Sequence, residues 1–278
     1  MIITDSQIHL WPTEGTAPPH HWRTPYTIER ALADMDAAGI DRVINCPAIW
    51  DPAAGDYADE AALAHPTRFG TMGRFVLDDG ADESRVDEWM AKPGMVGLRF
   101  LLNRPATDAA LADGALDWLW DAAHQRGLPV ALAALPEQLS IDAALRRIGD
   151  IARRFPGMRL LIDHLYLGPF DRLPEAAARF DALIDLARIP NVAVKASAVP
   201  AMATDPYPFA STHSLLRRVF DAYGAERMFW GSDFTRLQCS WEECVSLFTE
   251  ELPWLKGRDL ELVMGEAISN WIGWDDAP

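Results

Sequence analysis

The stretch "IITDSQIHLW", residues 2–11, is a short apolar strand that ends in polar side chains. Gln7 and His9 lie two residues apart, so in a β-strand their side chains share one face with Asp5. Trp11 continues the same spacing. A polar group at the end of a buried strand costs free energy unless it is paired or binds a ligand. The stretch therefore predicts a strand whose carboxyl end contributes to a functional site.

The same kind of β-rich run recurs along the whole chain, and amphipathic stretches typical of helices lie between the runs. The runs cover residues 2–9, 41–48, 69–76, 95–101, 128–135, 158–165, 191–197 and 227–234. The clearest helices are expected at residues 27–39, 115–127, 140–157 and 211–224. Alternating β and α units of this size favour a closed (β/α)8 TIM barrel in one domain spanning residues 1–278. A doubly wound open sheet is the alternative, but no glycine-rich turn follows the first strand.

Composition narrows the class of partner. The formal net charge is −16, so the surface repels phosphate backbones and nucleic acid is a poor candidate. The three cysteines form no CxxC pair, which indicates a reduced, cytoplasmic protein without structural zinc. Because the first residues include no basic stretch and no apolar run is long enough to span a membrane, we expect neither a signal peptide nor a membrane span. We expect a small-molecule substrate. Whether the protein forms a homo-oligomer is left open by the sequence.

Polar residues also end the later strands. Because catalytic groups of a (β/α)8 barrel gather at the carboxyl ends of its strands, we expect these side chains to converge. They are Arg99 in the fourth run, Asp163 and His164 in the sixth, Lys195 and Ser197 in the seventh, and Asp233 in the eighth, with Arg236 close behind.

Three of these strands offer metal-binding groups. His9, His164 and Asp233 can converge on one ion, with Gln7 beside them. Imidazole and carboxylate suit zinc or manganese, whereas the amide oxygen of glutamine is a weaker, neutral ligand.

Four segments in this order resemble the amidohydrolase superfamily: "DSQIH", "LIDHL", "VAVKAS" and "WGSDF". More narrowly they resemble its amidohydrolase-related branch (amidohydrolase 2), which includes lactonases acting on 2-pyrone-4,6-dicarboxylate, sugar lactones and muconolactones. The resemblance runs from residue 2 to about residue 273. It implies a distorted (β/α)8 barrel of the metal-dependent-hydrolase type. The usual first motif of the family is His-x-His, and Gln7 replaces its first histidine, so the resemblance implies one divalent metal (Zn or Mn) or none.

The resemblance also implies roles. The expected reaction is hydrolysis of a small lactone. Asp233 would take a proton from the attacking water and later return it to the leaving group. His164 and His9 would polarise the carbonyl group, directly or through an ion. Lys195 would stabilise the developing oxyanion or hold a substrate carboxylate.

Other residues are expected to bind the substrate. Arg99 and Arg236 suit a carboxylate, since a guanidinium can form two parallel hydrogen bonds with it, although each is equally well explained as a structural ion-pair partner. Gln7 is expected either to contact substrate or to orient its neighbours. The expected substrate is therefore a carboxylated or aromatic-derived lactone. The remaining expected pocket residues are Trp11, Trp50, Tyr166 and His213.

Two further functions remain open. One is a metal-dependent decarboxylase or hydratase of an aromatic or dicarboxylic acid on the same scaffold. The other is a non-catalytic ligand-binding barrel. Two structural expectations accompany them: Asp163 faces outward, and His20 and His21, in the proline-rich "TAPPHHWRTP" loop, are solvated.

Overall fold

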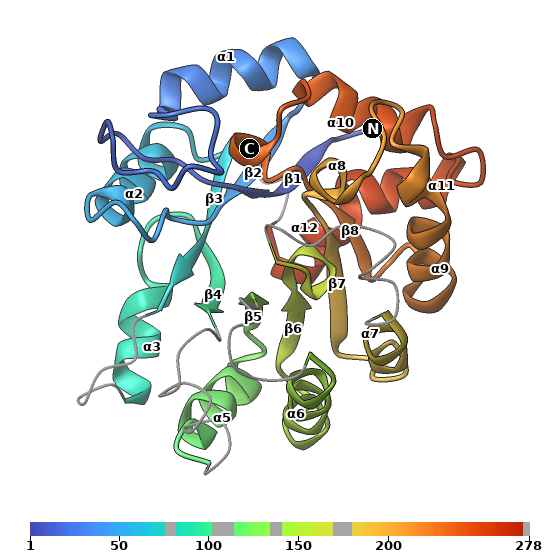
Figure 1. Cartoon of the computed structure of the whole chain (residues 1–278). Coiled ribbons are helices and arrows are strands. Elements are labelled where there is room, and N and C mark those ends of the chain that lie inside the picture. The colour runs from blue at the N-terminus through green and yellow to red at the C-terminus, as the bar shows by residue number, and fades with distance from the viewer. Residues whose placement is uncertain (76–81, 102–113, 134–140, 169–179, 275–278) are drawn as a thin grey trace.

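The computed structural model describes residues 1–75, 82–101, 114–133, 141–168 and 180–274. Parallel strands follow one another in the order β1 to β8 around a nearly closed barrel, with helices on its outside (Figure 1). The (β/α)8 prediction is confirmed, and each predicted run contains one strand. The strands are β1 Thr4–Ile8, β2 Arg42–Asn45, β3 Phe69–Arg74, β4 Met95–Leu101, β5 Pro129–Ala133, β6 Arg159–Ile162, β7 Val192–Ala196 and β8 Met228–Trp230.

The helices begin and end where local chemistry allows. In α1 the Thr27 side chain accepts a hydrogen bond from the Arg30 N–H, and Gly39 ends the helix with φ +69°, a conformation that glycine adopts readily. The predicted start of the third helix, residue 140, lies outside the described residues. The helices are α1 Ile28–Ala38, α2 Ala54–Ala64, α3 Glu83–Met90, α5 Asp117–Arg126, α6 Ile141–Arg154, α7 Phe180–Leu186, α8 Val199–Met202, α9 His213–Tyr223, α10 Trp241–Thr249, α11 Gly257–Glu261 and α12 Ala267–Ile272.

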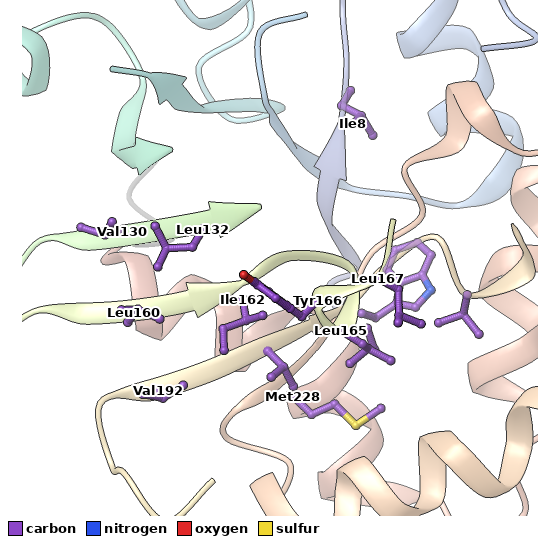
Figure 2. Close-up of a cluster of buried hydrophobic side chains, with 14 of the residues drawn as sticks. Ile8, Val130, Leu132, Leu160, Ile162, Leu165, Tyr166, Leu167, Val192 and Met228 are labelled. Atoms are coloured by element: carbon purple, nitrogen blue, oxygen red, sulfur yellow. The ribbon is translucent and has the colours of Figure 1, made fainter. Parts of the chain in front are cut away.

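Alternation along the strands divides the core into two parts. On β6, Leu160 and Ile162 point outward to the helices, and Figure 2 shows them in one cluster with Val130 of β5 and Val192 of β7. Leu161 belongs to the separate cluster inside the barrel. That inner cluster also contains buried residues of α12. Helix α12 therefore packs against the inside of the barrel, and the carboxyl ends of the strands remain for a site.

A buried carboxylate joins the last strand to the first. Oδ1 of Asp5 accepts the backbone N–H groups of Gln7 and Ser232, both at 2.9 Å. Oδ2 accepts the indole N–H of Trp241 at 2.8 Å, and the Asp233 N–H donates to the Gln7 carbonyl at 2.8 Å. Burial raises the pKa of Asp5 to about 6, although its hydrogen bonds favour the ionised form. These contacts close the seam between β8 and β1.

In the part of the chain that the structure describes, every helix is too short or too polar to cross a lipid bilayer.

Candidate active site

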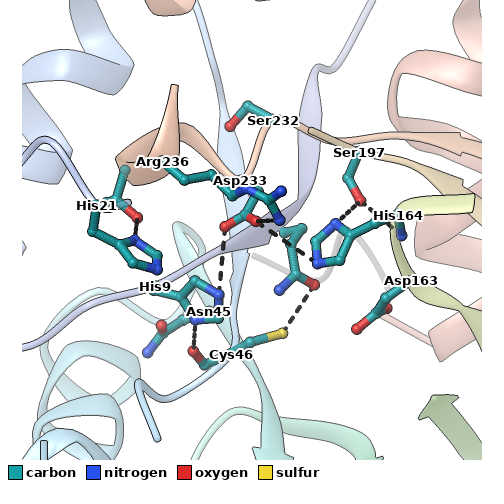
Figure 3. Close-up of polar contacts among 12 residues, drawn as sticks. His9, His21, Asn45, Cys46, Asp163, His164, Ser197, Ser232, Asp233 and Arg236 are labelled. Atoms are coloured by element: carbon teal, nitrogen blue, oxygen red, sulfur yellow. Dashed lines mark hydrogen bonds and ion pairs between the residues drawn. The ribbon is translucent and has the colours of Figure 1, made fainter. Parts of the chain in front are cut away.

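The structure brings three of the predicted residues together at the carboxyl ends of β1, β6 and β8 (Figure 3). Asp233 lies between two imidazoles: its Oδ1 is 3.4 Å from Nε2 of His9, and its Oδ2 is 3.7 Å from Nε2 of His164. Arg236 reaches back to Oδ2 with Nη1 at 3.1 Å. Asp233, His9, His164 and Arg236 are nearly or fully buried. We refer to these four residues as the reaction centre.

Left-handed backbone conformations aim two of these side chains. After β6, three consecutive residues have positive φ: His164 at 53°, Leu165 at 53° and Tyr166 at 60°. After β8, Asp233 has φ 53° and ψ 45°. Such conformations cost a non-glycine residue on the order of 1–3 kcal/mol and cluster at functional sites. The strained residues therefore lie where the side chains of His164 and Asp233 turn toward each other.

The tautomer of His9 follows from its backbone partner. Nδ1 lies 2.5 Å from the carbonyl oxygen of Cys46, which can only accept, so Nδ1 carries the hydrogen. Burial lowers the pKa of His9, which keeps the ring neutral and leaves Nε2 as an acceptor. Oδ1 of Asp233, the atom that faces Nε2, makes no hydrogen bond to any described residue. Two acceptors 3.4 Å apart therefore face each other, and a donor that lies beside the pair, such as a water molecule, can bridge both of them.

Asp233 remains ionised. Burial alone would raise its pKa, but His9, His164 and Arg236 outweigh that effect and hold the pKa well below its ordinary value. His164 is neutral, because burial lowers its pKa to about 4. Its Nδ1 is 2.8 Å from the Ser197 hydroxyl, which also accepts the His164 backbone N–H at 3.3 Å. The reaction centre thus combines a carboxylate with two neutral imidazoles.

Beside the reaction centre, three charges form a buried ion-pair network. Asp163 accepts Nε of Arg99 at 2.8 Å and faces Nζ of Lys195 at 3.1 Å. Burial would raise the pKa of Asp163, but the two cations lower it to about 2. The prediction that Asp163 faces outward is therefore wrong. Arg99 and Lys195 share this one carboxylate, and both cations are buried in the network.

Gln7 belongs to this network through its amide oxygen. Oε1 accepts a hydrogen bond from Lys195 Nζ at 3.0 Å and another from Cys46 Sγ at 3.2 Å. The atom that would ligate a metal is thus already held by an ammonium. Among the described residues, no group of three or more His, Cys, Asp or Glu side chains is placed to hold a metal ion. The donors around Gln7 do not fit a firmly bound divalent ion.

The other predicted pocket residues divide between the site and the core. Trp50 is half-buried, with its ring 5.5 Å from that of His9. Trp11 is fully buried behind Trp50, so it supports the site instead of lining a pocket. Tyr166 packs in the hydrophobic cluster of Figure 2. His213 donates from Nε2 to the Pro208 carbonyl at 2.9 Å, and among the described residues no hydrogen bond or ion pair joins it to the reaction centre.

A cavity of about 550 Å³ opens beside Arg236. Its walls come from the loop before α1 and from the segments that follow β7 and β8. They include His20, Trp22, Tyr207 and Phe209. A volume of this size suits a small organic molecule. The cavity therefore offers space for the part of a substrate that extends beyond the reaction centre.

Sequence reasoning missed His21. The prediction that this histidine is solvated is wrong, because only 6% of its surface is exposed and its ring lies 5.8 Å from that of His9. The burial depends on a contact with Thr235, far along the chain. Nothing in the "HH" pair indicates which member will be buried.

Comparisons with known proteins agree with this arrangement. The family model described as amidohydrolase matches residues 4–256. L-fucono-1,5-lactonase of Burkholderia ambifaria (strain ATCC BAA-244 / DSM 16087 / CCUG 44356 / LMG 19182 / AMMD) is 34% identical over 179 residues, which cover 64% of this chain and 50% of that protein. The chain thus matches about half the length of this curated relative.

Solved structures share the fold at lower identity. An amidohydrolase from Burkholderia multivorans with bound zinc has a TM-score of 0.78 at 19% identity, covering 98% of this chain and 99% of that one. A putative 2-pyrone-4,6-dicarboxylic acid hydrolase from Pseudomonas putida has a TM-score of 0.77 at 20% identity, covering 99% of each chain. Since the family model spans nearly all of the barrel, the chain belongs to the amidohydrolase family.

Proposed function

We propose that the protein is a lactonase that hydrolyses a small lactone at the carboxyl end of the barrel. The observation that carries this proposal is the pair of acceptors that face each other, His9 Nε2 and Asp233 Oδ1, 3.4 Å apart. One water molecule can donate a hydrogen to each of them. Family membership and the similarity to L-fucono-1,5-lactonase support the choice of reaction.

The mechanism uses the charge states of the reaction centre. With both hydrogens donated to His9 and Asp233, the water directs its oxygen lone pairs at the substrate carbonyl. Asp233 takes the proton as the water attacks, and the ring C–O bond then breaks as Asp233 returns the proton to the leaving oxygen. A base that is ionised at neutral pH suits this role. General acid–base catalysis of this kind contributes about 10²–10⁴-fold to a rate.

The role that we assign to His164 is to donate a hydrogen bond to the carbonyl oxygen of the lactone. When the Ser197 hydroxyl donates to Nδ1, Nε2 of His164 carries the ring hydrogen and can donate to the developing oxyanion. Lys195 is fully buried and bound to Gln7 and Asp163, so its proposed role is to fix those groups. This differs from the expectation that Lys195 contacts the substrate.

The ion pairs favour a neutral substrate. Arg99 and Lys195 are paired with Asp163, and Arg236 is paired with Asp233. A substrate carboxylate would have to compete with Asp163 or Asp233 for one of these buried cations in a protein of net charge −16. We therefore favour a neutral, hydroxylated lactone over a carboxylated one. We further propose that the reaction has weak or no dependence on a divalent metal, because Lys195 holds the Gln7 oxygen.

The test combines metal analysis with a substrate panel. Protein purified without chelator is analysed for metal by mass spectrometry. Hydrolysis of neutral aldonolactones and of carboxylated lactones is then followed by proton release before and after chelation. We expect hydrolysis of the neutral lactones, low metal content and an unchanged rate after chelation. Near-stoichiometric zinc or manganese with activity lost on chelation would overturn the metal assignment, and failure to hydrolyse any lactone would overturn the reaction.

A further inference from the structure

His21 occupies a buried position at the edge of the reaction centre. Its ring centroid lies 4.3 Å from that of Trp50, 5.8 Å from that of His9 and 5.8 Å from that of Trp11. Figure 3 shows His21 on the His9 side of Asp233. The segment that carries it precedes α1 and shows no strand or helix of its own around His21. Specific contacts must therefore hold the ring in place.

Those contacts come from the turn that carries Asp233. Nδ1 of His21 is 2.9 Å from the hydroxyl of Thr235, two residues beyond Asp233. The backbone N–H of Trp22 donates to the Thr235 carbonyl at 2.8 Å. The guanidinium of Arg23 donates to the carbonyls of Phe234 at 3.2 Å and of Leu237. The position of His21 is thus fixed relative to the proposed catalytic carboxylate.

The other ring nitrogen of His21 is available. Nδ1 is used by Thr235, and Nε2 makes no hydrogen bond to any residue that the structure describes. Burial lowers the pKa of His21 to about 3, so the imidazole is neutral at physiological pH. A nitrogen of a neutral imidazole can form a hydrogen bond with a hydroxyl group. The neutral ring carries no positive charge that would attract a carboxylate.

The sequence neighbours of His21 line the cavity, whereas the ring of His21 itself lies against His9 at the reaction centre. His20 and Trp22, on either side of it in sequence, line the 550 Å³ cavity together with Arg236. His21 itself contacts the ring of His9. A lactone whose carbonyl reached the reaction centre and whose substituents extended into the cavity would pass beside this segment.

We propose that His21 is a substrate-binding residue whose Nε2 forms a hydrogen bond with a hydroxyl group of the lactone. This inference rests on the lactonase function proposed above and adds a determinant of specificity. His21 distinguishes hydroxylated lactones from unsubstituted ones, while Asp233 and the two histidines beside it act on the ester common to both.

The experiment compares two substrates in one variant. His21→Phe keeps an aromatic ring beside Trp50 and removes both ring nitrogens, Nε2 and the Nδ1 that contacts Thr235. For a hydroxylated six-membered sugar lactone we expect kcat/KM to fall about tenfold, mainly through KM, which is the effect of one lost hydrogen bond. For δ-valerolactone, which has no hydroxyl group, kcat/KM should stay near the wild-type value. His21→Gln, which restores a polar group, should recover part of the loss.

Controls separate substrate binding from packing. Thr235→Val removes the partner of Nδ1 and should affect the hydroxylated lactone more than δ-valerolactone. His65→Ala changes a half-buried histidine after α2 and should leave kcat/KM for both lactones unchanged. Thermal denaturation of each variant checks that it folds. An equal loss for both lactones in His21→Phe, or no loss for either, would overturn the proposal.

A binding measurement keeps this proposal distinct from the proposed reaction. Titration calorimetry follows the binding of the corresponding hydroxylated δ-lactam to wild type and to His21→Phe. If wild type binds the lactam, the variant binds it about tenfold more weakly, and no lactone is hydrolysed, the His21 assignment stands and the proposed reaction fails. Equal lactam affinity in wild type and His21→Phe would overturn the assignment even if lactones are hydrolysed.

Discussion

Asp233 is the residue on which the proposed chemistry depends most directly. Asp233→Asn removes the acceptor that would take the proton of water while keeping the size of the side chain. We expect kcat for a neutral lactone to fall by about 10²–10⁴-fold, the usual contribution of a general base. Initial rates at saturating substrate measure the effect.

Asp259→Asn provides a matched control, because Asp259 is exposed on α11 and distant in sequence from any residue of the reaction centre. It should leave kcat unchanged. Retention of nearly full activity by Asp233→Asn would remove Asp233 from the role of base and require another acceptor for the proton.

Some residues of the candidate site could be predicted from the sequence and others could not. His9, His164 and Asp233 were predictable because each follows a buried strand, where an unpaired polar group is costly. The orientation of Asp163 was not. Strict alternation places it on the opposite face from His164, but alternation stops at Ile162, where β6 ends and left-handed residues follow. Both side chains are then buried and face inward.

At the scale of the element, the ends of α1 follow from local chemistry. Thr27 accepts the Arg30 N–H, one of the donors that a helix cannot satisfy within itself. Thr27→Ala should lower the free energy of unfolding by about 1 kcal/mol, the usual value of such a cap. Urea denaturation measures the loss, and kcat should stay at the wild-type value because Thr27 is not part of the reaction centre.

Thr27→Ser serves as the control, since serine keeps the hydroxyl group and should restore most of the stability. Equal losses in the alanine and serine variants would show that the methyl group matters, and not the hydrogen bond.

Caps of this kind explain why element order was predictable and strained turns were not. The Thr27 cap and the Gly39 terminus use residue types that suit their positions. The turns after β6 and β8 place histidine, leucine, tyrosine and aspartate in a conformation that each of them disfavours. Only the assembled barrel compensates for that cost, so local sequence preferences give no sign of these turns.

At the scale of the whole molecule, the Asp5 seam links stability to pH. The pKa of Asp5 is raised to about 6 from its ordinary value of 3.8, so the folded protein binds this proton more tightly than the unfolded chain does. Its stabilising contribution is present below about pH 4 and is lost as pH rises through 6. Across this interval the loss is on the order of 3 kcal/mol.

Comparison of wild type with Asp5→Asn isolates this effect, because His164, whose pKa is lowered, changes stability in the opposite direction over a similar range. We expect the stability of wild type relative to the variant to decrease between pH 4 and pH 7, as measured by urea denaturation at each pH. A constant difference across this interval would show that Asp5 has an unshifted pKa.

The seam also has a consequence for biosynthesis. It unites the first strand with the last, so His9 is synthesised early and acquires its carboxylate partner only when Asp233 is made. No amino-terminal fragment that stops before β8 contains the pair to which the chemistry is assigned. Chains that stall during translation before Asp233, or that lose the segment containing Asp233 to proteolysis, would therefore be catalytically inactive. Catalytic turnover would report only chains that extend beyond Asp233, and a chain divided between β4 and β5 would regain activity only when its two halves reassociate.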